Sequence, residues 1–176
     1  MATEHSKTLE ALQTAIQMEI EGKKYYQKMS RTSGNELGGK LFQALAEEED
    51  DHRRRFEEIY KAIEALKGWP EIDFKPGSRK DMKTLFFGAA ERLKDRIKST
   101  DSELKAVQKA MDMENKTYDF YMEQAGKASF EAEKRYYETL AGEERVHHLA
   151  LEDYYEYMKN PAGYFTLKEH SSLDGG

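Results

Sequence analysis

The sequence predicts an all-α fold: a four-helix bundle of two repeated helical hairpins, joined by a long crossover that contains a shorter helix. Apolar residues recur at helical spacing over four long segments. Only three prolines interrupt the 176 residues. A gap-free shift of 95 residues aligns residues 9–60 with residues 104–155, and 15 of 52 positions are identical. Chance would give about three or four identities at ordinary composition, so the second half repeats the first.

The first hairpin is expected to contain two long helices. We expect the first over residues 6–29 and the second over residues 36–66, because each carries a stripe of aliphatic or aromatic residues three or four positions apart. Residues 30–35 between them are polar and include Gly34. Such a short, glycine-bearing segment is typical of a break between antiparallel helices.

The crossover is expected to combine a connector and a shorter helix. Residues 67–78 hold two prolines and two glycines, which favour an irregular connector. Residues 78–98 follow as a shorter helix, which we interpret as a packing element or a dimer surface. A join this long lets the second hairpin pack in the orientation of the first.

The second hairpin begins with a capping signal. Thr100 and Glu103 form a capping-box pattern for the third long helix, which should end near Gly126. Ser129 is expected to cap the fourth long helix, which should end before Pro161. We therefore assign the bundle domain to residues 1–160 and an irregular C-terminal tail to residues 161–176.

Composition excludes several classes of protein and site. The chain has no cysteine, which excludes disulfides, thiolate zinc sites, cysteine-ligated iron–sulfur clusters and rubredoxin-type iron, and fits a cytoplasmic location. The net charge of −6 argues against nucleic acid as a partner. There is no signal-peptide pattern, and no apolar run approaches the roughly 20 residues that cross a bilayer, so we expect no membrane association.

The chemistry-bearing residues repeat with the hairpins. Each half has one glutamate on its first helix and, thirty residues later, a Glu-x-x-His pair on its second helix. Residues three apart on a helix lie about 60° apart in projection and about 4.5 Å along the axis. Both side chains of the pair can therefore reach the same small volume. The six residues are Glu19, Glu49, His52, Glu114, Glu144 and His147.

Helical projection places all six on the apolar, core-facing stripes. Four buried carboxylates without partners would cost several kcal/mol each or would have to protonate. Two divalent cations would balance the four charges, and oxygen-rich ligation with one imidazole per metal suits iron or manganese better than zinc or copper. By geometry, Glu49 and Glu144 should bridge the metals, Glu19 and Glu114 should be terminal ligands, and each histidine should bind one metal.

Some residues of the pattern have a simpler interpretation. A single Glu-x-x-His is common in an acidic helical protein, and only the duplicated, core-facing pattern indicates metal. Tyr26 and Tyr121 are either core aromatics or phenols that hydrogen-bond a ligand carboxylate. In the charged run of residues 47–55 we expect only Glu49 and His52 to point inward. His148 is expected at the surface or beside the ligands rather than among them.

The motifs resemble the rubrerythrin branch of the ferritin-like superfamily over residues 6–160. They are MEIEGKKYY with LAEEEDDH in the first half and MENKTYDFY with LAGEERVH in the second. The resemblance implies a di-iron site with the six residues above as ligands, manganese or zinc as possible substitutes, and Tyr26 and Tyr121 in a supporting role near the reacting centre. We also expect a homodimer.

The resemblance further implies a redox enzyme that reduces peroxide or oxygen in defence against oxidative stress. Thr117 stands where peroxidase-active relatives carry an extra glutamate, which implies a site without a redox-linked ligand shift and with weaker peroxidase activity. With no cysteine for a rubredoxin domain, electrons would come from a separate donor protein. The alternatives are a ferroxidase that handles or stores iron, a substrate-specific di-iron oxygenase, and metals that act only as structural staples.

Overall fold

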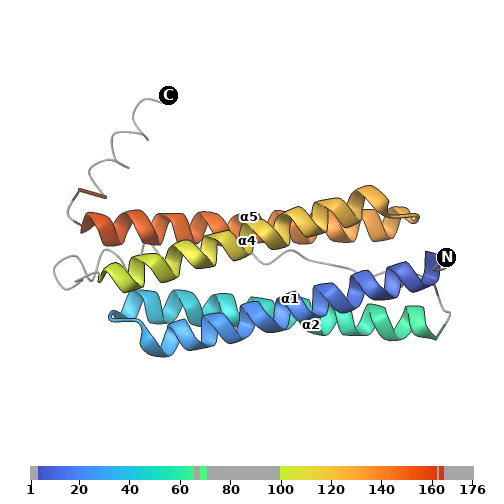
Figure 1. The fold of residues 1–176 in the computed structure, drawn as a ribbon, viewed down its shortest axis with the longest axis horizontal. Coiled ribbons are helices and arrows are strands. Elements are labelled where there is room, and N and C mark those ends of the chain that lie inside the picture. Colours follow the sequence, from blue (N-terminus) through green and yellow to red (C-terminus); the bar gives the residue numbers. More distant parts are fainter. Residues whose placement is uncertain (1–3, 66–67, 71–99, 162, 165–176) are drawn as a thin grey trace, which may run out of the picture.

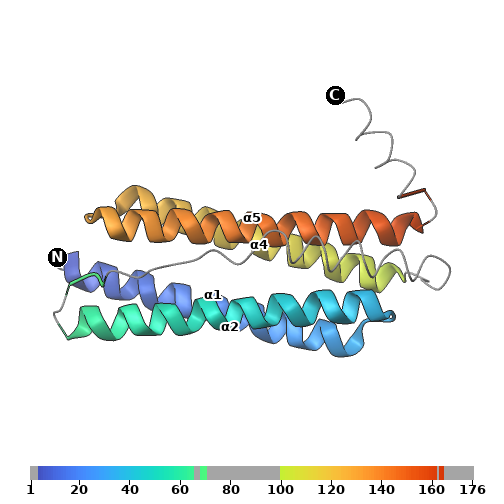
Figure 2. The same cartoon turned by 180° about the vertical axis from the view of Figure 1, so that it is seen from behind.

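The computed structural model describes residues 4–65, 68–70, 100–161 and 163–164. These residues form four long helices: α1 (Glu4–Thr32), α2 (Glu36–Glu64), α4 (Asp101–Lys127) and α5 (Glu131–Lys159). Helices α1 and α2 form one antiparallel hairpin, α4 and α5 form the other, and the hairpins lie side by side (Figure 1; Figure 2). The predicted four-helix bundle is therefore confirmed. The predicted shorter helix of residues 78–98 lies outside the described residues.

The directions of the helices match a bundle with one long crossover. Helices α1 and α5 run the same way, and α2 and α4 run the opposite way (Figure 1). Helix α2 ends at one end of the bundle and α4 begins at the other (Figure 2). This arrangement of the four helices matches ferritin-like topology, in which the two hairpins are joined by one long crossover.

Side chains cap two of the helices. The Asn35 side-chain oxygen accepts a hydrogen bond from the Gly38 backbone N–H at 2.8 Å and so caps α2. The Thr100 hydroxyl accepts one from the Glu103 N–H at 3.2 Å, which confirms Thr100 as the cap of α4. The Glu103 carboxylate instead accepts a hydrogen bond from the Ser33 hydroxyl at 2.8 Å, so it joins the two hairpins at this end.

Several sequence-based boundaries differ from the structure. Helix α1 continues to Thr32, beyond the predicted end at residue 29, and α2 ends at Glu64 rather than at residue 66. The residue that caps α5 is Phe130 rather than Ser129, and the cap makes no side-chain hydrogen bond. The Ser129 backbone N–H instead donates a hydrogen bond to the Glu133 carboxylate at 3.3 Å. The predicted irregular tail is wrong at its start, because Pro161 and Tyr164 are helical. Tyr164 is buried and packs edge-on against the Tyr157 ring, which stabilises that turn.

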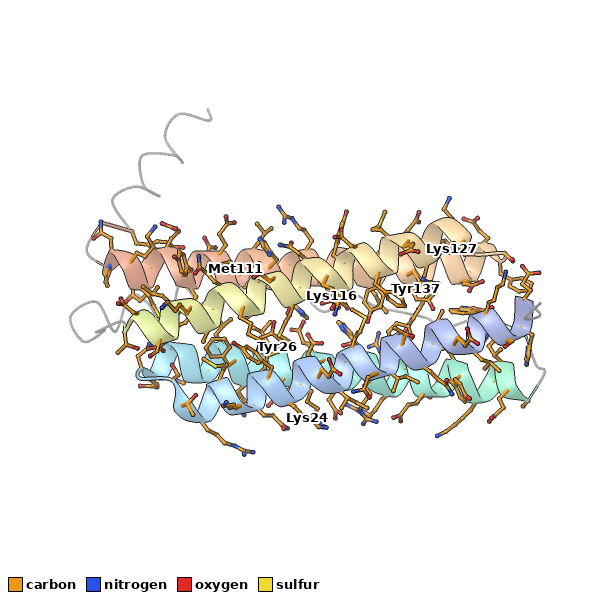
Figure 3. All side chains as sticks on the ribbon, viewed as in Figure 1. Lys24, Tyr26, Met111, Lys116, Lys127 and Tyr137 are labelled. Carbon is orange, nitrogen blue, oxygen red and sulfur yellow. The ribbon has the colours of Figure 1, made fainter. Side chains whose placement is uncertain are left out.

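Two apolar clusters make up the core of the residues that the structure describes. One contains Tyr26, Phe42 and Tyr154, and the other contains Phe56 and Tyr137, each with aliphatic neighbours from both hairpins. Figure 3 shows Tyr26 and Tyr137 between the hairpins, towards opposite ends of the bundle. Polar residues occupy the space between the clusters. Among the described helices, none is long and apolar enough to cross a membrane.

Candidate metal centre

All six residues predicted as metal ligands lie between the two apolar clusters. Each helix contributes from its middle, and the residues are at most 4% exposed. Burial of six ionisable groups in one place is costly unless they share a partner. The six residues are Glu19 on α1, Glu49 and His52 on α2, Glu114 on α4, and Glu144 and His147 on α5.

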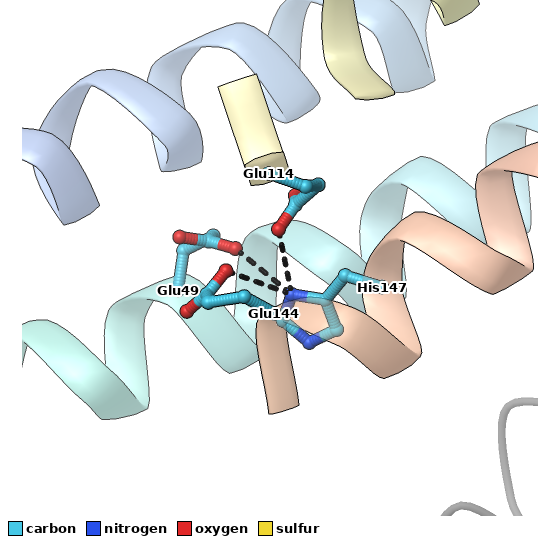
Figure 4. Close-up of side chains that lie close together, drawn as sticks. All are labelled: Glu49, Glu114, Glu144 and His147. Atoms are coloured by element: carbon cyan, nitrogen blue, oxygen red, sulfur yellow. Dashed lines mark ion pairs between the residues drawn. The ribbon is translucent and has the colours of Figure 1, made fainter. Parts of the chain in front are cut away.

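Four of these side chains surround one small volume. The Nδ1 atom of His147 lies 3.3 Å from a Glu49 oxygen, 3.5 Å from a Glu114 oxygen and 3.6 Å from a Glu144 oxygen (Figure 4). One ligand atom from each of the four lies within 4.8 Å of all the others. The group therefore offers one nitrogen and three oxygens to a single cation.

A second volume lies around His52. Its Nδ1 atom is 3.6 Å from Glu19 Oε2 and 3.4 Å from Glu144 Oε1. Glu49 belongs to this group as well as to the first. The Glu144 carboxylate directs Oε1 towards His52 and Oε2 towards His147. Glu49 and Glu144 thus occupy the shared positions that we expected of bridging ligands, and Glu19 and Glu114 each lie in one group only.

The hydrogen bonding of the six side chains tests whether a metal pair fits. Each has one buried nitrogen or oxygen that makes no hydrogen bond: Oε2 of Glu19, Oε1 of Glu49, Nδ1 of His52, Oε2 of Glu114, Oε1 of Glu144 and Nδ1 of His147. A buried polar atom without a partner costs about 1–3 kcal/mol, and more when charged. All six atoms face the two shared volumes. Cations there would satisfy them together, so the donor set fits two divalent metal ions.

Burial and neighbouring charges shift the pKa values of the six groups in both directions. Burial favours a raised pKa for Glu19 and Glu114, but the charge of the adjacent histidine outweighs it and lowers both. Burial, followed by the negative charges of Glu19 and Glu144, raises the pKa of Glu49 well above the usual range. Burial and the charge of Glu114 raise the pKa of Glu144 to about 7. Burial opposes protonation of His52, but the charge of Glu19 and the hydrogen bond with Glu143 outweigh it and raise the His52 pKa. Metal-free chains therefore keep protons here that cations would replace.

These pKa shifts predict how the stability of the metal-free protein depends on pH. The raised pKa of Glu144, about 7 against an ordinary 4.5, means that the folded chain holds more protons than the unfolded chain in that interval. Glu49 and His52 act in the same direction. We expect the melting temperature of the metal-free protein to fall as pH rises from about 5 to about 8.

Thermal unfolding followed by circular dichroism, with a chelator present, checks this prediction. The zinc-loaded protein is the control, and its melting temperature should rise over the same range because zinc competes with protons for the ligands. A metal-free melting temperature that rises with pH would contradict the buried charge arrangement.

Two tyrosines hold the terminal carboxylates across the hairpin interface. The Tyr26 hydroxyl on α1 donates a hydrogen bond to Glu114 on α4, and the Tyr121 hydroxyl on α4 donates one to Glu19 on α1. Burial and the neighbouring carboxylate raise the pKa of both phenols well above the usual range. The phenols therefore stay protonated and act as donors, and they are more than core aromatics. A part in catalysis remains a prediction.

Glycine at position 22 gives the Glu49 carboxylate room. Gly22 lies on α1, one turn after Glu19, and is buried. A Cβ atom at this position would lie 2.9 Å from Glu49 Oε2, closer than real Cβ atoms approach. In the second hairpin the repeat places Thr117 at the corresponding position, where its hydroxyl donates to the Met113 carbonyl at 3.1 Å. The two halves of the site are therefore not identical.

Two carboxylates of the site were not predicted from the sequence. Glu48, expected in the solvated part of the charged run, lies 2.7 Å from His147 Nε2. Glu143 is buried and lies 2.7 Å from His52 Nε2. The expectation that only Glu49 and His52 of that run point inward is therefore wrong for Glu48. The signal was available, because Glu48 and Glu143 are identical residues at equivalent positions of the repeat.

His148 lies beside the site without joining it. Its Nδ1 atom is 3.3 Å from the Met111 carbonyl oxygen, and the side chain is half-buried. It belongs to neither of the two groups of candidate ligands.

Comparison with known proteins agrees with this geometry. A family model described as rubrerythrin matches residues 10–155, which include all six candidate ligands and both tyrosines. No curated protein and no solved structure matches the chain.

Proposed function

The chain belongs to the rubrerythrin family, and on this premise we propose that it is a di-iron protein that reduces hydrogen peroxide, or oxygen, with electrons from an external donor. The observation that carries the proposal is the set of six buried ligand atoms without hydrogen bonds, one from each predicted ligand. Four carboxylates match the charge of two ferrous ions, and one imidazole per metal suits iron.

A di-iron pair at this site would supply the two electrons and the Lewis acidity that reduction of a peroxide to two water molecules requires. The protein side chains hold the pair and exclude bulk water, since the ligands are almost fully buried between apolar clusters. Tyr26 and Tyr121 restrain the terminal carboxylates through their hydroxyl groups. The two protons that the reaction consumes must reach the oxygen atoms from solvent.

Reducing electrons must come from outside this domain. The 176 residues contain no cysteine that could bind an iron–sulfur cluster or a rubredoxin-type iron. We propose a separate electron-donor protein that reduces the metal pair after each turnover. Thr117, which offers no carboxylate, supports slower peroxide turnover than in relatives with a glutamate at this position.

Stopped-flow oxidation of the di-ferrous protein tests the proposal. Mixing oxygen-free di-ferrous protein with hydrogen peroxide should oxidise both irons of a chain together, faster than peroxide oxidises free Fe²⁺ in the same buffer. One peroxide should be consumed for two irons. Zinc-loaded protein, which has no accessible redox change, is the control. Oxidation no faster than that of free Fe²⁺ would refute the redox function.

The same preparation separates the alternative functions. A protein that stores iron would take up many more than two irons per chain and form a large hollow assembly, which light scattering detects. A substrate-specific oxygenase would consume oxygen only when its organic substrate is added. Metals that act only as staples would leave the loaded protein inert to peroxide, oxygen and reductants.

A further inference from the structure

The two ligand histidines have a second contact that the metal site does not use. Each imidazole directs Nδ1 towards the shared volumes, and its Nε2 atom lies 2.7 Å from a carboxylate oxygen. For His52 the carboxylate is Glu143, and for His147 it is Glu48. None of the ligand assignments involves these two glutamates.

Both contacts cross from one hairpin to the other. His52 on α2 contacts Glu143 on α5, and His147 on α5 contacts Glu48 on α2. Each glutamate precedes a bridging carboxylate by one residue. The same contact between hairpins therefore occurs twice. In each case a carboxylate of one hairpin restrains the imidazole of the other.

The chemistry of imidazole determines which group donates and which accepts in these contacts. A neutral histidine that binds a cation through Nδ1 carries its proton on Nε2, and only an acceptor can pair with that proton. A carboxylate in this position fixes the tautomer, restrains rotation of the ring and makes the ligand nitrogen more basic. Glu48 and Glu143 meet this requirement at hydrogen-bond distance.

The two carboxylates differ in their environment. The Glu143 side chain is 9% exposed, whereas the Glu48 side chain is 36% exposed. Solvent screens a hydrogen-bonded charge, so the buried contact should have the larger effect.

We propose that Glu48 and Glu143 are positioning residues, each of which orients the ligand histidine of the opposite hairpin. The metal position at His52 depends on Glu143 more strongly than the position at His147 depends on Glu48. This inference rests on the metal-binding part of the proposed function, and it is independent of which oxidant the metal pair reduces.

Zinc binding to four variants tests the proposal without any assay of activity. In a chelator competition, Glu143→Ala should lower the affinity for one of the two zinc ions about 10–100-fold. Glu48→Ala should lower the affinity for the other zinc ion by a smaller factor. Glu143→Gln and Glu48→Gln keep an acceptor oxygen, so each should restore part of the lost affinity. The exposed Glu152 on α5 and Glu47 on α2 provide matched controls, Glu152→Ala and Glu47→Ala.

Nitrogen-15 NMR of the labelled histidines supplies a readout that simple destabilisation does not move. In zinc-loaded wild-type protein, both ligand imidazoles should show a protonated Nε2 that exchanges slowly with water. In Glu143→Ala the His52 signal alone should exchange faster, and in Glu48→Ala the His147 signal alone. If an alanine variant does not fold, the isosteric glutamine variant replaces it. The glutamine variant should show a smaller increase in exchange, again confined to the signal of one histidine.

The outcomes separate this inference from the proposed function. Wild-type protein that binds two zinc ions, with variants that match it in affinity and in both histidine signals, would overturn the positioning role alone. Wild-type protein that binds no zinc would overturn the metal site and this inference together. Two bound metals with no reaction towards peroxide or oxygen would overturn only the redox function.

Discussion

Glu144→Ala should leave the protein able to bind at most one metal ion per chain. Glu144 directs one oxygen towards each histidine, so its removal takes a donor from both positions. It also removes negative charge between two cations that repel each other at short range. Elemental analysis after loading with excess metal and gel filtration gives the stoichiometry directly. Two metals per chain in this variant would refute the bridging assignment.

The same substitution should not harm the metal-free fold at neutral pH. Burial raises the pKa of Glu144 to about 7. Above that pH, the buried carboxylate lowers the free energy of unfolding when no cation is bound. Metal-free Glu144→Ala should therefore unfold at a temperature no lower than metal-free wild type at about pH 8. Glu152→Ala, an exposed change on the same helix, should bind two metals and serves as the control.

Gly22→Ala should lower metal affinity while leaving the metal-free helix intact. The new Cβ would meet Glu49 Oε2 at 2.9 Å, and the free end of this side chain can move away when no metal holds it. A bridging carboxylate has no such freedom, because both of its oxygens would be fixed by cations. We expect affinity to fall at least tenfold, which corresponds to about 1.4 kcal/mol. Isothermal titration of the metal-free variant measures this loss.

Gly142→Ala is the matched control for that change. Gly142 is exposed within α5, and an added Cβ there would meet no atom within 4 Å. Replacing an exposed helical glycine with alanine stabilises a helix by about 0.5–1 kcal/mol. Both variants should therefore fold, with only Gly22→Ala impaired in metal binding. Equal metal affinity in the two variants would show that Gly22 does not make room for the carboxylate.

The arrangement of the six candidate ligands could be predicted because it follows from local periodicity. Glu49 and His52 share a face through helical spacing alone, and the repeat places Glu144 and His147 on an equivalent face. The polar break before α2 and the capping residue Thr100 are likewise local signals. Tyr26 and Tyr121 were located by the same periodicity, although it left their hydrogen bonds undecided.

The features that sequence analysis missed depend on contacts between hairpins. Glu48 lies at the edge of the core-facing stripe of α2. Whether its carboxylate faces solvent or contacts His147 depends on how α5 packs against α2. The need for Gly22 arises only where the Glu49 carboxylate approaches α1. Phe130 rather than Ser129 caps α5, because boundaries of helices shift by a residue with little change in energy. The homodimer and the electron donor remain predictions.

Titration of the metal-free protein with ferrous iron in the absence of oxygen tests the two-metal site most directly. We predict saturation at two irons per chain, and a stoichiometry of at most one for Glu144→Ala under the same conditions. The six buried ligand atoms without hydrogen bonds are the structural reason for this expectation. Saturation of the wild-type chain at one iron or none would contradict a di-iron site at this position.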